Sequence, residues 1–194
     1  MMYIHMELCK ESLESKLVEE EELPRHMAWS YFRQILEALQ FIHGKDIIHR
    51  DLKPNNIFID DSGTVKIGDF GLALQMDVSS TTNSSPVGAY LYRAPEMKKG
   101  VCITNKVDMY ALGLILFQLF GPRRDTAIQR LKDSASPRQV CEICEKYKVD
   151  ETAKPLILKL LRTDPLKRPS AADLLQDLDT LEGKKQEAQL QKLS

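Results

Sequence analysis

A stripe of hydrophobic residues runs through residues 24–43 at the spacing of one helix face. Its apolar positions recur mostly three or four residues apart, and they are Met27, Ala28, Tyr31, Ile35, Leu39 and Ile42. Such a stripe is typical of a surface helix that packs against a core. Pro24 suits the first helical turn, and Gly44 suits the position after the last turn. The pattern therefore predicts an amphipathic helix over residues 24–43.

A second hydrophobic segment, residues 109–120, has no polar face. It reads MYALGLILFQLF and is interrupted by Gln118. A membrane-spanning helix needs about 20 apolar residues, so this run is too short to cross a bilayer. We predict a buried core helix at residues 104–120. The remaining helical predictions are shorter: they cover residues 12–18, 151–162 and 170–181, with one short helix inside an irregular stretch at residues 122–137.

Short strand-like runs predict a small amount of β-structure. Residues 57–59 (IFI) and 65–67 (VKI) flank residues 60–63 (DDSG), a turn-forming sequence, and this is the pattern of a β-hairpin. Residues 3–8 alternate apolar and polar and suggest one more strand. Residues 77–85 are rich in Ser and Thr and are predicted to form a loop. The fold class that follows is mainly α with a small β-hairpin.

The amino-acid composition and net charge indicate which classes of binding partner to expect. Hydrophobic residues make up 43% of the 194 residues and charged residues 28%, with a net charge of -1. These values are ordinary for a globular protein. A nearly neutral chain gives no reason to expect nucleic acid or an anionic membrane as a partner of this segment. Glu7 and Lys10 come too soon after the first residue for a secretory signal.

One pair of cysteines has the spacing of a metal or redox motif. Cys141 and Cys144 stand three positions apart, but no second pair completes a zinc site. The alternative interpretation is that both are small apolar residues on one face of a helix. We favour this second interpretation, because a single such pair is a weak signal.

Three short polar motifs carry the candidate chemistry: IHRDLKPNN at residues 48–56, DFG at residues 69–71 and APE at residues 94–96. Taken singly, the first would most often be a capped turn and the second a plain loop. Together, in this order and with the hairpin between the first two, they resemble the catalytic loop, the magnesium loop and the end of the activation segment of eukaryotic protein kinases. The resemblance continues at VDMYALG (residues 107–113) and DPLKRP (residues 164–169) and covers nearly the whole chain.

The resemblance implies a role for each polar residue of the first two motifs. Asp51 would accept or orient the proton of the attacking hydroxyl group, and Lys53 would meet the γ-phosphate of ATP. Asn56 and Asp69 would supply oxygen ligands to Mg²⁺, a hard cation that prefers them. Gly71 would give the backbone freedom beside the metal ligand. The cofactors implied are therefore ATP and Mg²⁺.

Further residues of the motifs would position the site rather than react. The resemblance implies that Glu96 pairs with Arg168 and that Asp108 holds the backbone of the catalytic loop. Arg50, next to the catalytic aspartate, would bind a phosphate on the activation segment. The backbone of Glu7 and Cys9, in MELC at residues 6–9, would form the hinge that bonds adenine.

Other stretches resemble one group of Ser/Thr kinases, those that phosphorylate the alpha subunit of translation initiation factor two. They are residues 66–73, 87–96 and 113–119. This likeness implies a cytoplasmic enzyme in stress control of translation, with a protein substrate docked on the helix at residues 125–131. Ser84 falls where these kinases carry their main activating phosphate. Ala89 stands where they carry a threonine that ties the catalytic aspartate and lysine together.

The small lobe expected of a kinase is not found in this sequence. No Gly-x-Gly-x-x-Gly occurs, and all nine glycines lie at or after Gly44. We therefore expect a kinase C-terminal lobe without its N-terminal lobe. The expected organisation is the end of a small-lobe strand and the hinge at residues 1–10, the C-terminal lobe at residues 11–182 and a frayed tail at residues 183–194.

Three hypotheses on function remain open at this point. The chain could be part of an active Ser/Thr kinase, which the intact Asp51, Lys53, Asn56 and Asp69 favour. It could be a catalytically weak lobe that docks the substrate or regulates a partner kinase, which Ala89 and the missing lobe favour. It could also be a fragment that folds poorly. Nucleotide binding and cooperative unfolding distinguish the three.

Overall fold

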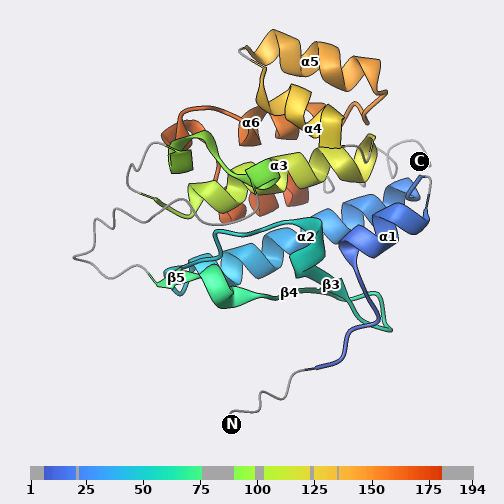
Figure 1. Ribbon diagram of the computed structural model, residues 1–194, viewed down its shortest axis with the longest axis vertical. Coiled ribbons are helices and arrows are strands. Elements are labelled where there is room, and N and C mark those ends of the chain that lie inside the picture. The colour runs from blue at the N-terminus through green and yellow to red at the C-terminus, as the bar shows by residue number, and fades with distance from the viewer. Residues whose placement is uncertain are drawn as a thin grey trace, which may run out of the picture.

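The short strands and the helices that follow residue 105 occupy opposite sides of one long helix, α2 (Arg25–His43), in the computed structural model (Figure 1). The structure describes residues 7–20, 22–75, 90–98, 103–122, 125–134 and 136–180. The short strands lie against one side of α2, and α3 (Lys106–Phe120) lies against the other side. The predicted fold class, mainly α with a small β-hairpin, is confirmed in this part of the chain.

The first two helices begin and end close to the predicted boundaries. α1 (Leu13–Glu19) begins after Ser12, whose hydroxyl oxygen accepts a hydrogen bond from the backbone N–H of Ser15 at 3.1 Å. α2 begins one residue after Pro24, whose carbonyl oxygen accepts the N–H groups of Met27 and Ala28. The predicted stripe of α2 faces the core, since Ala28, Tyr31, Phe32, Ile35, Leu36, Leu39 and Ile42 are buried.

The predicted hairpin is present and is part of a three-stranded sheet. β3 (Ile57–Ile59) and β4 (Val65–Ile67) pair antiparallel, with Ile57 opposite Ile67. β1 (Glu11–Ser12) adds to the free side of β3, and a separate pair joins β2 (Ile47–Ile48) to β5 (Leu74–Gln75). Two-residue strands are too short to leave a periodic pattern, so the sequence analysis did not detect them. The strand predicted at residues 3–8 falls mostly outside the described residues, and residues 7–9 do not form a strand.

The hydrophobic core helix predicted from MYALGLILFQLF is α3, which is buried on all sides. It packs against α2 and against α6 (Lys154–Leu160). Gly113 permits the close approach of α6, because a Cβ atom there would lie 2.8 Å from Leu160 Cβ and 2.9 Å from Leu161 Cδ2. No helix in the described part of the chain combines the length and the apolar run that crossing a bilayer requires.

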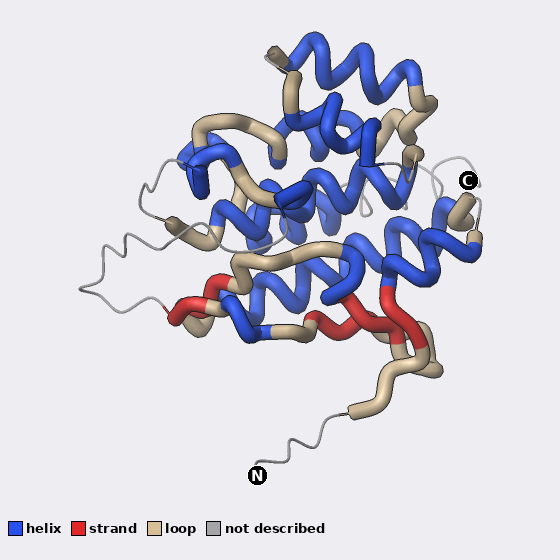
Figure 2. The backbone as a smooth tube through the Cα atoms, in the orientation of Figure 1, coloured by secondary structure: helices blue, strands red, loops and turns tan. Residues whose placement is uncertain are grey.

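Two further helices form the outer layer at the end of the molecule away from the strands (Figure 2). α4 (Asp125–Lys132) is the short helix predicted within residues 122–137, and α5 (Pro137–Lys146) stacks on it. Residues 171–180 form the last described helix. The predicted tail at residues 183–194 lies outside the described residues.

The cysteine pair lies on α5. Cys144 is fully buried, Cys141 is partly buried, and both thiols are free. Burial raises the pKa of the Cys144 thiol to about 11, which disfavours the reactive thiolate. Among the described residues, no three His, Cys, Asp or Glu side chains are grouped closely enough to hold a metal. The burial of Cys144 on this helix agrees with the interpretation of the cysteines as apolar residues of a helix.

Candidate active site

The loop between β2 and β3 brings the side chains of Lys53 and Asn56 to the carboxylate of Asp51. Lys53 Nζ donates to Asp51 Oδ2 at 2.7 Å, and Asn56 Nδ2 donates to the same oxygen at 3.1 Å and to the Asp51 carbonyl oxygen at 2.9 Å. Asp51 is 7% exposed and Asn56 is 4% exposed. The predicted proximity of Asp51 and Lys53 is thus present, and the carboxylate is fixed in direction by two donors.

Asp108, at the start of α3, holds the backbone of this loop. Its Oδ2 accepts the N–H of His49 and its Oδ1 accepts the N–H of Arg50, each at 2.9 Å. This is the contact expected from the resemblance. His43, the last residue of α2, adds a partner that the sequence analysis missed, because its Nε2 lies 2.9 Å from Asp108 Oδ2. Nothing in a helix-terminal histidine signals a contact 65 positions away.

Arg50 stands in a strained backbone conformation that these contacts maintain. Its φ angle is 66°, in the left-handed region that side chains other than glycine rarely adopt. Its guanidinium Nε donates to the Leu72 carbonyl oxygen at 2.5 Å, just after the DFG motif. The predicted role of Arg50, binding a phosphate on the activation segment, stays a prediction. Ser84, the expected site of that phosphate, lies outside the described residues, as does Ala89.

His49 connects the first motif to the second motif. The N–H of Asp51 donates to His49 Nδ1 at 3.3 Å, so the ring proton of a neutral imidazole resides on Nε2, which lies 2.8 Å from the Gly68 carbonyl oxygen. The ring of Phe70 contacts the His49 ring at a centroid distance of 5.0 Å. The backbone just before Asp69 is therefore fixed relative to Asp51.

Asn56 and Asp69 reach the same end of the hairpin. The N–H of Gly68 donates to the Asn56 carbonyl oxygen at 2.9 Å, which sets Asp69 one residue beyond the ladder. Asp69 is exposed and has a φ angle of 59°, and Gly71 is also exposed. The amide nitrogen of Asn56 is used on Asp51, so its Oδ1 and the Asp69 carboxylate are the oxygens that fit Mg²⁺. A Mg²⁺ ion commonly takes one or two protein oxygens and completes its shell with phosphate and water, so this donor set suits a nucleotide-bound ion.

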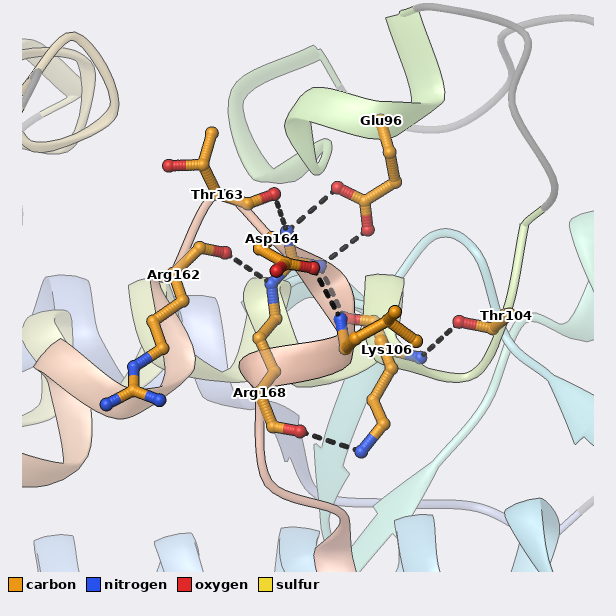
Figure 3. Close-up of polar contacts among 8 residues, drawn as sticks. Glu96, Thr104, Lys106, Arg162, Thr163, Asp164 and Arg168 are labelled. Atoms are coloured by element: carbon orange, nitrogen blue, oxygen red, sulfur yellow. Dashed lines mark hydrogen bonds and ion pairs between the residues drawn. The ribbon is translucent and has the colours of Figure 1, made fainter.

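The predicted ion pair between Glu96 and Arg168 is present and buried (Figure 3). Arg168 Nη1 donates to Glu96 Oε1 at 2.5 Å, and Nη2 donates to Oε2 at 2.8 Å. The other guanidinium N–H groups donate to backbone carbonyl oxygens of Arg162, Lys106 and Thr163. All five donors of the guanidinium are thereby used, which fixes the APE motif to the helical core.

The expected hinge residues lie at the start of the described chain. Glu7 and Leu8 are exposed, and Cys9 is partly buried. The Glu7 side chain forms an ion pair with Lys66 of β4, a contact that the sequence analysis did not predict. The role of Glu7 and Cys9 in binding adenine stays a prediction.

Comparison with known proteins agrees with the motifs. The family model described as the protein kinase domain matches residues 1–178. The eIF-2-alpha kinase GCN2 of Schizosaccharomyces pombe is 37% identical over 194 residues, which covers 90% of this chain and 12% of that protein. The eukaryotic translation initiation factor 2-alpha kinase 3 of Rattus norvegicus is 34% identical over 195 residues, which covers 91% of this chain and 17% of that protein.

Solved structures agree in fold. The crystal structure of the yeast RNA Pol II CTD kinase CTDK-1 complex matches with a TM-score of 0.73 at 27% sequence identity, over 88% of this chain and 67% of the matched chain. The chain spans 12% and 17% of the length of the two relatives named above, so most of each relative has no counterpart in it.

Proposed function

The chain belongs to the protein kinase family, and on that premise we propose that it is the C-terminal lobe of a Ser/Thr kinase that phosphorylates the alpha subunit of translation initiation factor two. The reaction transfers the γ-phosphoryl group of ATP to a protein hydroxyl group. Relatives whose names state this activity support the choice of this substrate. Such a kinase acts in the cytoplasm and slows translation under stress.

The observation that supports this proposal best is the carboxylate of Asp51 with its two donors. Phosphoryl transfer needs placement and charge more than covalent chemistry from the protein. Asp51 orients the acceptor hydroxyl group. Lys53, whose Nζ lies 2.7 Å from Asp51 Oδ2, supplies positive charge for the transferred phosphoryl group. Asn56 Oδ1 and the Asp69 carboxylate would hold Mg²⁺, and the ion would neutralise charge on the phosphates of a bound nucleotide.

Part of the nucleotide site has to come from outside these residues. A kinase also covers the phosphates with a glycine-rich loop, and the chain has no such sequence. Preorganised charge works best where water is excluded, so a lobe without this cover binds ATP weakly and transfers phosphate slowly. The cover comes from a small lobe of the same protein or from a partner kinase.

The test uses the endogenous protein, captured with an antibody against residues 183–194. The captured protein is incubated with Mg²⁺, γ-labelled ATP and the full-length alpha subunit. Its mass is determined in the same sample. We expect label on a hydroxyl of the alpha subunit, and none when Asp51→Asn is introduced into the gene. Label that persists in the variant would assign the activity to a co-purifying kinase and contradict the proposal.

The second candidate function is a docking module with little catalysis, and Ala89 favours it. The resemblance implies a hydroxyl at that position that ties the catalytic aspartate and lysine together, and alanine cannot form those bonds. Ala89→Thr in the full-length protein should raise the rate of phosphotransfer if the first function holds. The docking module would be supported if the protein binds the alpha subunit while neither the wild type nor Ala89→Thr transfers phosphate.

A further inference from the structure

The segment between α4 and α5 contains a Ser-Pro dipeptide that the proposed function does not use. The sequence has two such dipeptides, at residues 85–86 and 136–137, and the second lies within the described residues. Proline-directed kinases take a serine followed by proline as their acceptor. Whether Ser136 suits such an enzyme depends on its conformation, on the use of its hydroxyl group and on the charges around it.

Ser136 stands just outside α5, and its hydroxyl proton is not used by any described residue. Its backbone is extended, with φ -146° and ψ 154°, as expected for a residue before proline. It is half-buried, and its Oγ accepts the N–H of Gln139 at 3.4 Å. Ser134 differs, because its Oγ donates to the Arg130 carbonyl oxygen at 3.0 Å and no proline follows it. Of these two serines, Ser136 is therefore the better acceptor.

Ser136 lines a cavity of about 430 Å³ between α5 and the chain that follows α6. Arg162 and Lys167 line the same cavity, and both are exposed. Among the described residues no ion pair uses Arg162, while the Lys167 ammonium group lies 3.8 Å from Asp164 Oδ2. These two cations and one carboxylate give the cavity an excess of positive charge. A phosphate carries about two negative charges at neutral pH, so it would be attracted to this cavity.

The chain after α6 also holds the buried ion pair of the APE motif. The carbonyl oxygens of Arg162 and Thr163 accept N–H groups of Arg168 at 2.6 Å and 3.3 Å, and Arg168 binds Glu96. Arg162 Nη1 donates in turn to the Lys167 carbonyl oxygen at 3.1 Å. A phosphate bound by Arg162 and Lys167 would therefore connect α5 to the residues that surround Arg168.

From these observations we propose that Ser136 is a phosphorylation site for a proline-directed kinase, and that its phosphate binds Arg162 and Lys167 and fixes α5 to the chain after α6. In the modifying kinase, the Ser136 oxygen attacks the γ-phosphorus of ATP. The bond from Oγ to phosphorus forms, and the bond from that phosphorus to the β,γ-bridging oxygen breaks. ADP leaves with the bonding electrons, and the hydroxyl proton passes to the carboxylate base of that kinase. The inference does not depend on catalysis by Asp51, because the reaction takes place in another enzyme.

The first test maps phosphate on the endogenous full-length protein, captured from cells treated with a phosphatase inhibitor. Mass spectrometry of the peptide that contains Ser136 compares wild type with Asp51→Asn, Ser134→Ala and Pro137→Ala, each introduced into the gene. We expect phosphate on Ser136 in the first three proteins and none in Pro137→Ala. Ser136 without phosphate in the wild type overturns the inference. Phosphate lost from Asp51→Asn, or retained in Pro137→Ala, contradicts modification by a proline-directed kinase.

The second test measures hydrogen–deuterium exchange of residues 162–168 in the full-length protein, before and after phosphorylation by a purified cyclin-dependent kinase. We expect the phosphate to slow exchange by roughly two- to fivefold, the range for exposed ion pairs. The double variant Arg162→Met/Lys167→Met should accept phosphate equally but show no slowing. The matched control is Lys159→Met, which removes an ion pair with Asp177 outside the cavity and should behave as the wild type.

Thermal unfolding of each variant before phosphorylation verifies that it is folded. Equal slowing in the double variant overturns the assignment of Arg162 and Lys167 as the phosphate ligands. Either negative result leaves the proposed function intact, because transfer of phosphate to the alpha subunit is measured separately and depends on Asp51.

Discussion

Two ionic clusters of the molecule contain buried carboxylates but differ in how their charges are satisfied. In the first cluster, Glu96 and Arg168 are 7% and 2% exposed, and every guanidinium donor has a protein acceptor. In the second cluster, Asp51 is 7% exposed but its partner Lys53 has a side chain that is 24% exposed, and Asp69 is exposed. The first cluster is closed, and the second remains accessible to a ligand.

This difference separates a structural ion pair from a reactive one. Breaking a closed pair leaves a charge that water cannot reach, so its cost appears in the free energy of unfolding. A group in the open cluster can be hydrated when its partner is removed. Its loss should therefore affect phosphotransfer far more than stability.

Arg168→Met is the strongest test of the difference between the closed and the open cluster. The change leaves Glu96 buried without its counter-charge, and we expect the free energy of unfolding to fall by about 3–5 kcal/mol. Urea unfolding of both proteins measures the difference. Arg162→Met is the control, because Arg162 is exposed, and it should change stability by no more than about 0.5 kcal/mol. A loss below ~1 kcal/mol for Arg168→Met would show that water reaches Glu96.

Gly113→Ala tests the buried core between α3 and α6 through packing instead of charge. The added methyl group would meet Leu160 and Leu161 at 2.8 and 2.9 Å, and overpacking of this kind costs about 1–3 kcal/mol. Gly71→Ala is the matched change in the open region, where the new Cβ would lie 3.3 Å from Asp69 Oδ1 and would meet no other atom of the described residues within 4 Å, apart from its neighbours along the chain. Thermal unfolding should show a loss for Gly113→Ala alone. Equal losses would contradict the distinction between the two regions.

Asp51→Asn tests the open cluster. The amide can still accept a hydrogen bond from Lys53, and Lys53 is partly exposed, so the free energy of unfolding should change by no more than about 1 kcal/mol. Phosphotransfer in the full-length protein should fall by roughly 10²–10⁴-fold, the usual contribution of a group that acts on the proton of the nucleophile. A large fall in the free energy of unfolding with little loss of phosphotransfer rate would show that Asp51 has a structural role instead.

The smallest expected effect is a pH dependence of stability, which arises from Asp60 in the hairpin turn. Hydrogen bonds from the Ser62 hydroxyl and the Thr64 N–H lower the pKa of Asp60 from 3.8 to about 2. Because the folded-state pKa is the lower one, the stabilisation is present above pH ~4 and is lost as the pH falls towards 2. Urea midpoints across this range should fall less steeply for Asp60→Asn. Parallel curves for the two proteins would contradict a role for this carboxylate.

Much of the fold was visible in local patterns. Residues 24–43 and 104–120 were predicted as helices, and α2 and α3 occupy Arg25–His43 and Lys106–Phe120. Residues 57–59 and 65–67 were predicted as a hairpin, and they form β3 and β4. These elements are visible because side chains three or four apart in a helix, and two apart in a strand, share one environment. The two-residue strands and α5 gave no periodic signal of comparable length.

The sequence by itself determined which polar groups the chain carries and in what order, and this was enough to place Asp51, Lys53, Asn56 and Asp69 in one motif set. Only the tertiary structure decided which of these groups are closed off and what holds them. Asp108 meets His43 across 65 positions, Arg168 meets Glu96 across 72, and Lys132 meets Leu91 across 41. No repeat along the chain encodes such contacts, because they depend on how α2, α3 and α4 pack together. Packing also sets the exposure of each charge, and hence whether its removal costs stability or rate.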